Sequence, residues 1–266
     1  MPKTQNQKTY ASAQIVNYYR SLNALQPAEQ MILDRLSPSL SNLKMLDIGV
    51  GAGRTTQYFC DQTAEYIGID SSPEMIAACQ NRFSQSPLKN ANVSFEVCDA
   101  RDMNCFADDT FDFILFSFNG IDYVPLSDRL RILNEVFRIS KPKGIFYFST
   151  HNLQGFEQAF TWKSQWSLNP IATYTNLMIL GIMRVLNRPL NLSQLRDLSF
   201  AIVKDESHNF RLSTFYIRPQ AQIEQLEKSF SDIEVYSWKD NVELIGTSDR
   251  TENTDMWLYY CCRAKA

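Results

Sequence analysis

The sequence has few of the residues that mark several large classes of protein. It contains two histidines and six cysteines in 266 residues, and no two cysteines form a Cys-x-x-Cys pair. This pattern is not typical of a disulfide framework or a zinc site, so we expect free thiols, a reducing compartment and no bound metal. The formal net charge is −3. A nucleic-acid partner is therefore not expected, because nucleic-acid-binding surfaces usually carry a basic excess.

Long apolar runs are also missing. No run reaches the length of a membrane span, and no signal peptide is visible at the N-terminus. We therefore expect a cytoplasmic protein without membrane contact. Hydrophobic residues make up 44% of the chain and charged residues 21%, which predicts a globular fold with a sizeable core. The absence of repeats and of Gly-, Pro- or Ser-rich linkers predicts a single domain over residues 1–266.

Glycine is scarce, yet three of the nine glycines fall at Gly49, Gly51 and Gly53. They follow an apolar run at 45–48, which predicts a buried strand, and precede the start of a helix at 54–59. Glycine lets a ligand approach the backbone closely, and a helix N-terminus favours anionic or polar groups. A strand, a glycine loop and a helix thus predict a nucleotide-sized site, with a tight turn that binds nothing as the alternative.

Asp70 is the second indication of a nucleotide site. It ends a second apolar run and lies 21 residues after Gly49. At this distance a carboxylate commonly accepts hydrogen bonds from two ribose hydroxyls. The alternative is a capping role, because Ser71, Ser72 and Pro73 predict that a helix starts there.

Further strands and helices alternate along the first half of the chain. Such alternation predicts a doubly wound, Rossmann-like parallel α/β sheet with right-handed crossovers. The predicted strands are 45–48, 66–70, 93–98, 111–117 and 145–148, with a helix at 129–139 between the last two.

Five segments of the chain resemble class I S-adenosylmethionine-dependent methyltransferases, of the small-molecule kind similar to types 11 and 25. They occur in the order and spacing of that family and lie at 46–54, 68–75, 98–100, 111–115 and 138–144. Lys143 stands where the family usually has glycine, at a surface turn. The Asn/Asp-Pro-Pro-Tyr box of enzymes that methylate nucleobase amino groups is missing at 117–120.

The resemblance implies S-adenosylmethionine as cofactor and a role for each matching residue. Gly49 and Gly51 would support its methionine part, and Asp70 would hold the ribose. The remaining assignments to the cofactor site are Met75 against adenine, Asp99 with the Ala100 amide at the adenine edge, Ser117 and Phe118 beside the methyl group, and Asp47, Val50, Arg54 and Ser71 around the loop. Tyr18 and Tyr19, in a predicted N-terminal helix, are either packing residues or a cofactor contact, and Tyr18 is the one assigned to the site.

The resemblance also implies the layout of the whole chain. We expect a seven-stranded sheet whose last strand is antiparallel, with N-terminal helices at 1–43 and the cofactor-binding core at 44–151. A helical cap would follow at 152–198, and a hairpin with the closing helix and strands at 199–266. The apolar stretch 171–186 is either part of this cap or a homodimer contact.

Methyl transfer from a sulfonium is an in-line displacement that depends mainly on positioning and on the exclusion of water. A base helps only when the acceptor is a hydroxyl, a thiol or a protonated amine. The candidates are His151, Tyr123 and His208, and the sequence does not choose among them. The acceptor is expected to be a largely apolar small molecule, and the methylated atom is left open.

Two other functions use similar motifs. An NAD(P)-dependent oxidoreductase would share the glycine loop and the ribose acid, but its Gly-x-Gly-x-x-Gly pattern would place glycine where Arg54 stands. A methyltransferase-like protein that binds a partner without catalysis is the second alternative.

Overall fold

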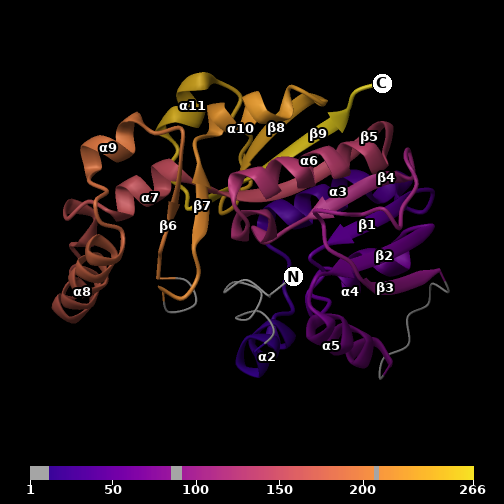
Figure 1. Cartoon of the computed structure of the whole chain (residues 1–266), viewed down its shortest axis with the longest axis horizontal. Helices are drawn as coiled ribbons and strands as arrows, with labels where there is room; N and C mark the ends of the chain where they lie inside the picture. Colours follow the sequence, from indigo (N-terminus) through magenta and orange to yellow (C-terminus); the bar gives the residue numbers. More distant parts are fainter. Residues whose placement is uncertain (1–11, 85–91, 207–209) are drawn as a thin grey trace.

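A mixed sheet of nine strands forms the centre of the protein, shown in Figure 1. The computed structural model describes residues 12–84, 92–206 and 210–266. The strands are β1 (Lys44–Ile48), β2 (Glu65–Asp70), β3 (Val93–Val97), β4 (Phe111–Phe116), β5 (Ser140–Asn152), β6 (Phe200–Val203), β7 (Thr214–Ile217), β8 (Phe230–Ser237) and β9 (Trp257–Ala264). The main helices are α2 (Ala13–Ser21), α3 (Pro27–Leu40), α4 (Thr56–Phe59), α5 (Pro73–Ser84), α6 (Leu126–Ile139), α7 (Leu153–Ala159), α8 (Pro170–Leu186), α9 (Leu192–Asp197), α10 (Pro219–Leu226) and α11 (Thr247–Glu252).

The order of the strands confirms the predicted fold class. Strands β3, β2, β1, β4 and β5 lie side by side and parallel, and β9 runs antiparallel between β5 and β8. The number of strands differs from the expected seven because the hairpin β6–β7 joins the same sheet. Strand β7 pairs with the last two residues of β5, His151 and Asn152, beyond Phe148, where β4 ends its pairing with β5.

The central strands are buried on both faces, and their side chains alternate between two hydrophobic clusters. In β4, Ile114 and Phe116 pack on the face covered by α6 and α10, while Phe113 and Leu115 pack on the face covered by α3 and α4. Figure 1 shows α6 and α3 on opposite sides of the sheet. This arrangement explains why the strands read as continuous apolar runs in the sequence.

The N-terminal helices cover both a sheet face and the glycine loop. Helix α3 begins with a capping box, in which Gln26 N–H donates to the Glu29 carboxylate at 2.7 Å, and with Pro27 in its first turn. Its buried residues join the core of the sheet. Helix α2 lies next to α5, and its residue Tyr19 lines the same cavity as Gly49 and Gly51 of the glycine loop.

Helices α7, α8 and α9 form a lobe at one end of the molecule, far from β3 (Figure 1). The lobe has a small hydrophobic cluster of its own, to which the hairpin β6–β7 also contributes Ala201, Val203 and Tyr216. The division of the chain at residue 198 stays a prediction, but the hairpin shares its packing with the helices of the cap. Within the described ranges, no helix combines the length and the apolar character needed to cross a bilayer.

Candidate functional site

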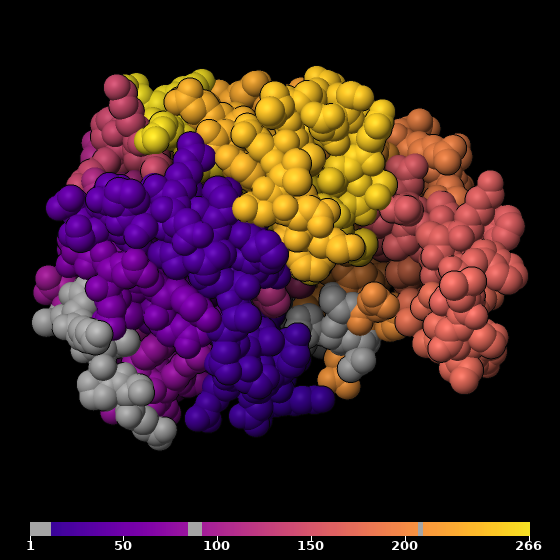
Figure 2. Space-filling view, turned by 180° about the vertical axis from the view of Figure 1, so that it is seen from behind, coloured from indigo at the N-terminus to yellow at the C-terminus, as the bar shows by residue number. Residues whose placement is uncertain are grey.

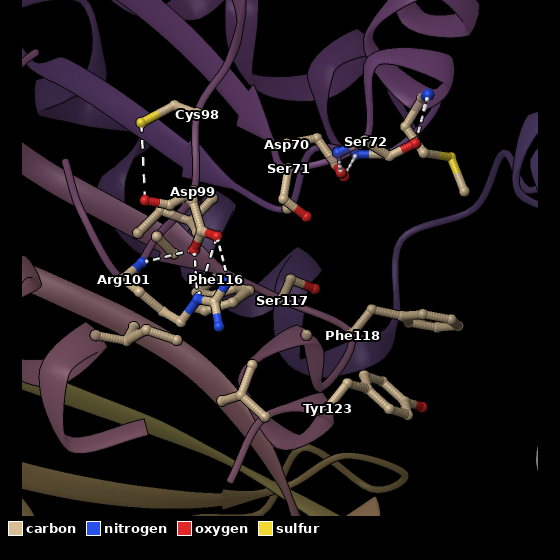
Figure 3. A pocket seen from close by; sticks show the side chains of 18 of the residues that line it. Asp70, Ser71, Ser72, Cys98, Asp99, Arg101, Phe116, Ser117, Phe118 and Tyr123 are labelled. Carbon is tan, nitrogen blue, oxygen red and sulfur yellow. Dashed lines mark hydrogen bonds and ion pairs between the residues drawn. The ribbon is translucent and has the colours of Figure 1, made fainter. Parts of the chain in front are cut away.

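A cavity of about 500 Å³ opens at the carboxyl ends of β1, β2 and β4. This is the edge of a parallel sheet where ligands bind in open α/β folds. Nine of the thirteen residues assigned to the cofactor line it, several of which are drawn in Figure 3. They are Gly49, Gly51, Asp70, Ser71, Met75, Asp99, Ala100, Ser117 and Phe118.

Gly51 and Gly53 of the loop both have positive φ angles, but an added side chain would meet different surroundings at the two positions. Gly51 has φ +56°, and an added Cβ would meet nothing closer than 3.9 Å, so its missing side chain leaves open space at the cavity. Gly53 has φ +82°, and an added Cβ would lie 2.5 Å from the ring of Phe83. The missing side chain of Gly51 therefore leaves space in the cavity, whereas the missing side chain of Gly53 lets the loop pack closely against α5.

Asp70 ends β2 and holds the loop with both carboxylate oxygens. One oxygen accepts from the Gly51 N–H at 3.1 Å, and the other accepts from the Ser72 N–H at 2.8 Å. Each oxygen keeps a further lone pair with which it could accept a hydroxyl. Burial raises the pKa of Asp70 to about 6, although these two hydrogen bonds favour the charged form.

Asp99, which follows β3, is fixed by Arg101. The Arg101 guanidinium donates to both carboxylate oxygens, at 2.9 Å and 2.6 Å, and also donates to Asp128 at 2.7 Å. Partial burial alone would raise the pKa of Asp99, but the pairing with Arg101 outweighs it and the pKa lies below its usual value. Asp99 therefore presents an ionised and oriented carboxylate to the cavity.

The turn after β4 is strained at Phe118 and Asn119. Their φ angles are 59° and 60°, in the left-handed region that residues other than glycine rarely adopt. The Asn119 N–H donates to the Ser149 hydroxyl at 2.8 Å, and the Arg54 guanidinium lies 4.8 Å from the Phe118 ring centroid. Strain of this kind gathers at functional sites, where the surroundings hold it in place.

Four assigned residues do not line the cavity. Tyr18 is 51% exposed on α2, and its neighbour Tyr19 lines the cavity instead. Val50 is buried against α5. Asp47 accepts from the Thr55 hydroxyl at 2.5 Å and from the Tyr66 hydroxyl at 2.6 Å, so it fastens the loop to the sheet.

Arg54, the fourth of these residues, belongs to a buried network under the loop. Its guanidinium donates to both oxygens of Glu29 at 2.5 Å, and Glu29 is fully buried on α3. The Ser117 hydroxyl and the Tyr259 hydroxyl also contact Glu29. Burial alone would raise the pKa of Glu29, but the pairing with Arg54 lowers it below its usual value. The network joins α3, the glycine loop, β4 and β9, and it places Ser117 beside the cavity.

The three candidate bases have different surroundings. Tyr123 lines the cavity, whereas His151 is buried behind it and their ring centroids lie 6.3 Å apart. His151 Nδ1 lies 2.8 Å from an Asp122 carboxylate oxygen, and that carboxylate also accepts from Arg129 and from the Thr150 hydroxyl. His208 lies outside the described residues.

Sequence reasoning missed residues that come from distant parts of the chain. Tyr19 is the second of the two tyrosines that the sequence offers as a cofactor contact, and Arg101 directly follows the matched segment 98–100. Ile202 and Ser213, from the hairpin β6–β7, line the cavity opposite the core. No local pattern in the sequence indicates that this hairpin reaches the cavity.

Comparison with known proteins agrees with this geometry. Residues 45–144 match the family described as a methyltransferase domain. A ubiquinone biosynthesis O-methyltransferase of Rhodopseudomonas palustris (strain TIE-1) is 35% identical over 115 residues, which cover 42% of this chain and 42% of that protein. The chain spans 30% to 55% of the length of the curated relatives that it matches.

Two solved structures share the fold over most of the chain. A S-adenosylmethionine-dependent methyltransferase from Mesorhizobium loti has a TM-score of 0.59 and 18% identity, with 89% of this chain and 97% of that chain covered. A 1,6-didemethyltoxoflavin-N1-methyltransferase from Burkholderia thailandensis, solved with S-adenosylhomocysteine, has a TM-score of 0.59 and 14% identity, with 98% and 87% covered.

The fold and the cavity define an α/β protein with a cavity of small-molecule size at the edge of a parallel sheet. Together with the family match, they support its assignment to the class I S-adenosylmethionine-dependent methyltransferases, as the resemblance in the sequence implied. This assignment favours a methyltransferase over the alternative of a nicotinamide-dependent oxidoreductase.

Proposed function

We propose that the protein transfers a methyl group from S-adenosylmethionine to a small-molecule acceptor. The observation that carries the proposal is that Asp70, Gly51, Asp99 and Phe118 line one cavity. Its volume of about 500 Å³ lies within the range of roughly 300–1,000 Å³ that is usual for small-molecule sites.

The residues of the cavity fit this cofactor. The open space at Gly51 and the remaining lone pairs of Asp70 suit a ribose and the chain attached to it. The carboxylate of Asp99 suits the amino group of a base, and Met75 supplies an apolar wall. When bound, S-adenosylmethionine supplies an electrophilic methyl group. Ser117 and Phe118, held in place by Glu29 and Arg54, would fix the geometry beside that group.

The acceptor side of the cavity favours an apolar molecule. It is lined by Tyr123, Val124 and Pro125 after β4 and by Ile202 of the hairpin. These side chains would exclude water and hold the acceptor in line, which supplies much of the rate in a displacement reaction. The acceptors of the relatives differ, because one is named an O-methyltransferase and another an N1-methyltransferase. We therefore propose the acceptor by class only.

Calorimetry tests the binding step. S-adenosylmethionine and S-adenosylhomocysteine should bind, and NAD should not. The variant Asp70→Asn should weaken binding, whereas Asp240→Asn, at an exposed residue in the turn after β8, should leave it unchanged. Transfer of a labelled methyl group into the small-molecule fraction of a cell extract would then show catalysis. If the protein binds NAD, or binds neither methyl donor nor its product, the proposal is wrong.

For acceptors that must lose a proton, we propose His151 as the base and Asp122 as the positioning residue. Asp122 accepts at Nδ1 and thereby leaves Nε2 of the imidazole as the proton acceptor. Nε2 lies 3.4 Å from the side-chain amide nitrogen (Nδ2) of Asn119, which belongs to the strained turn after β4. His151→Gln should lower kcat with little change in KM, whereas Tyr123→Phe should leave kcat nearly unchanged. The opposite pattern would assign the base to Tyr123.

A further inference from the structure

The cap carries an apolar face that nothing in the described chain covers. On α8, Thr173, Leu180 and Met183 are buried against the lobe. The opposite side of the helix carries large apolar residues at helical spacing, exposed by between 42% and 75%: Ile171, Tyr174, Met178, Ile182 and Val185. The segment just before α8 adds Trp162, Trp166 and Leu168, which are also exposed. We call these eight residues the outer face.

The outer face is unusual for this protein. Ten of the sixteen exposed large hydrophobic residues of the described chain lie between 162 and 186. In Figure 2 this part of the chain forms a separate lobe at the edge of the molecule. Apolar residues gathered in this way usually mark a contact surface, because isolated exposed residues would be scattered over the protein.

The charge around the outer face has one sign. Residues 158–196 contain four basic residues and no acidic residue, although the whole chain has a net charge of −3. Arg196 pairs with Glu157. Lys163, Arg184 and Arg188 are exposed and form no ion pair with any residue that the structure describes. Lys163 lies between the two tryptophans, and Arg188 follows Val185 at helical spacing beyond the end of α8.

We propose that the outer face binds the surface of a bilayer that contains anionic phospholipids. Tryptophan and tyrosine are favoured at the boundary between lipid and water, where their rings are half buried. Lysine and arginine can lay their apolar stems along lipid while their charged ends reach the phosphates. A helix with such a face lies in the plane of the membrane and adds electrostatic attraction to apolar burial.

This proposal revises the expectation of a protein without membrane contact, which rested on the missing membrane-spanning run. Helix α8 has 17 residues and would lie on the bilayer without crossing it. A second copy of the chain is the competing occupant. A symmetric contact through the same face would bring the cations of both copies together, and residues 158–196 offer no carboxylate to pair with them. An anionic surface supplies the missing charge.

The test uses the full chain and sedimentation with vesicles. Vesicles of phosphatidylglycerol and phosphatidylcholine should bind the protein, and vesicles of phosphatidylcholine alone should bind it much more weakly. The variant Met178→Glu/Ile182→Glu should lose binding by at least tenfold, because two carboxylates would face the lipid. Its control is Val242→Glu/Ile245→Glu, which alters two exposed apolar residues that do not belong to the outer face.

The contribution of the basic residues to vesicle binding is tested by a second variant, which keeps the apolar residues of the outer face. Removing Lys163, Arg184 and Arg188 by substitution with glutamine should weaken binding about fivefold for each cation, so on the order of a hundredfold together. The control replaces Lys228 and Lys239, two exposed lysines elsewhere, and should change little. Circular dichroism and binding of S-adenosylhomocysteine check that each variant is folded.

The outcomes are distinct. Binding that depends on anionic lipid and on the outer face supports the proposal. Absence of vesicle binding, or binding that survives both variants of the outer face, overturns it. A wild-type dimer by light scattering that Met178→Glu/Ile182→Glu converts to a monomer, without vesicle binding, also overturns it and assigns the face to a second copy.

Discussion

Replacement of Asp70 by asparagine tests the cofactor site at its most informative point. The substitution keeps the size of the side chain but removes its charge and one of its two acceptor atoms. Both carboxylate oxygens of Asp70 hold backbone N–H groups, at 3.1 Å and 2.8 Å, and both would also face the ribose hydroxyls. Asparagine could satisfy only part of these donors, so both the loop and the ligand lose hydrogen bonds.

The expected loss can be worked out from these contacts. A hydrogen bond to a charged group contributes about 1.5–3 kcal/mol, so loss of one such bond should weaken S-adenosylhomocysteine about tenfold to a hundredfold. A pH dependence follows from the pKa of Asp70, which burial raises to about 6. The free protein takes up a proton as the pH falls through this value, and the charge that attracts the hydroxyls is lost. Affinity should therefore be full above about pH 7 and should fall below about pH 6.

Calorimetry at pH 8 and at pH 5 measures both effects. Wild-type affinity should drop at the lower pH, and Asp70→Asn should be weak at pH 8 and nearly independent of pH. The difference between the two proteins isolates Asp70 from Asp47, whose pKa burial also raises to about 6. Wild-type affinity in the asparagine variant at pH 8, with the fold intact, would refute the assignment of Asp70 to the ribose.

Three further predictions concern the loop, the buried network and the cap. Gly51→Val should abolish cofactor binding by filling the open space at the loop, whereas Gly181→Val, on the exposed side of α8, should not alter calorimetric affinity. Glu29→Gln should lower the free energy of unfolding by about 3–5 kcal/mol in urea, because Arg54 would stay buried without its counter-ion; a loss below about 1 kcal/mol would contradict this. Amide hydrogen exchange should be faster in α8 and α9 than in β1 and β4, and equal rates would show that the cap is part of the rigid core.

The cofactor half of the fold could be predicted because its signals are local. A strand, a glycine loop and an acid at a fixed distance follow one another in the sequence, and Gly51 and Asp70 meet in the cavity as expected. Two of the assigned residues that do not line the cavity, Arg54 and Asp47, lie close to the loop. Arg54 is directed away from the cavity by its ion pair with Glu29, and Asp47 by its hydrogen bond from Tyr66. Such partners are distant in the sequence and leave no local pattern.

The same limit explains the strand count and the far wall of the cavity. The hairpin β6–β7 was expected, but its pairing with β5 depends on two residues at the end of a long strand. Its place over the cavity through Ile202 depends on the packing of the whole lobe. The length of a hairpin can be read from turn residues, whereas its partner in a sheet cannot.

The pairing between Asn152 and Ile217 has a consequence for how this protein could change over time. The chain leaves β5 for the lobe after Asn152 and comes back beside β5 at the end of β7, where Ile217 pairs with Asn152. Because the ends of the excursion lie side by side, a shorter, longer or unrelated segment could be exchanged there without moving β1, β2 or the glycine loop. A change of this segment could alter the part of the cavity wall that the hairpin supplies, whereas Tyr123, Val124 and Pro125 belong to the part that would be retained.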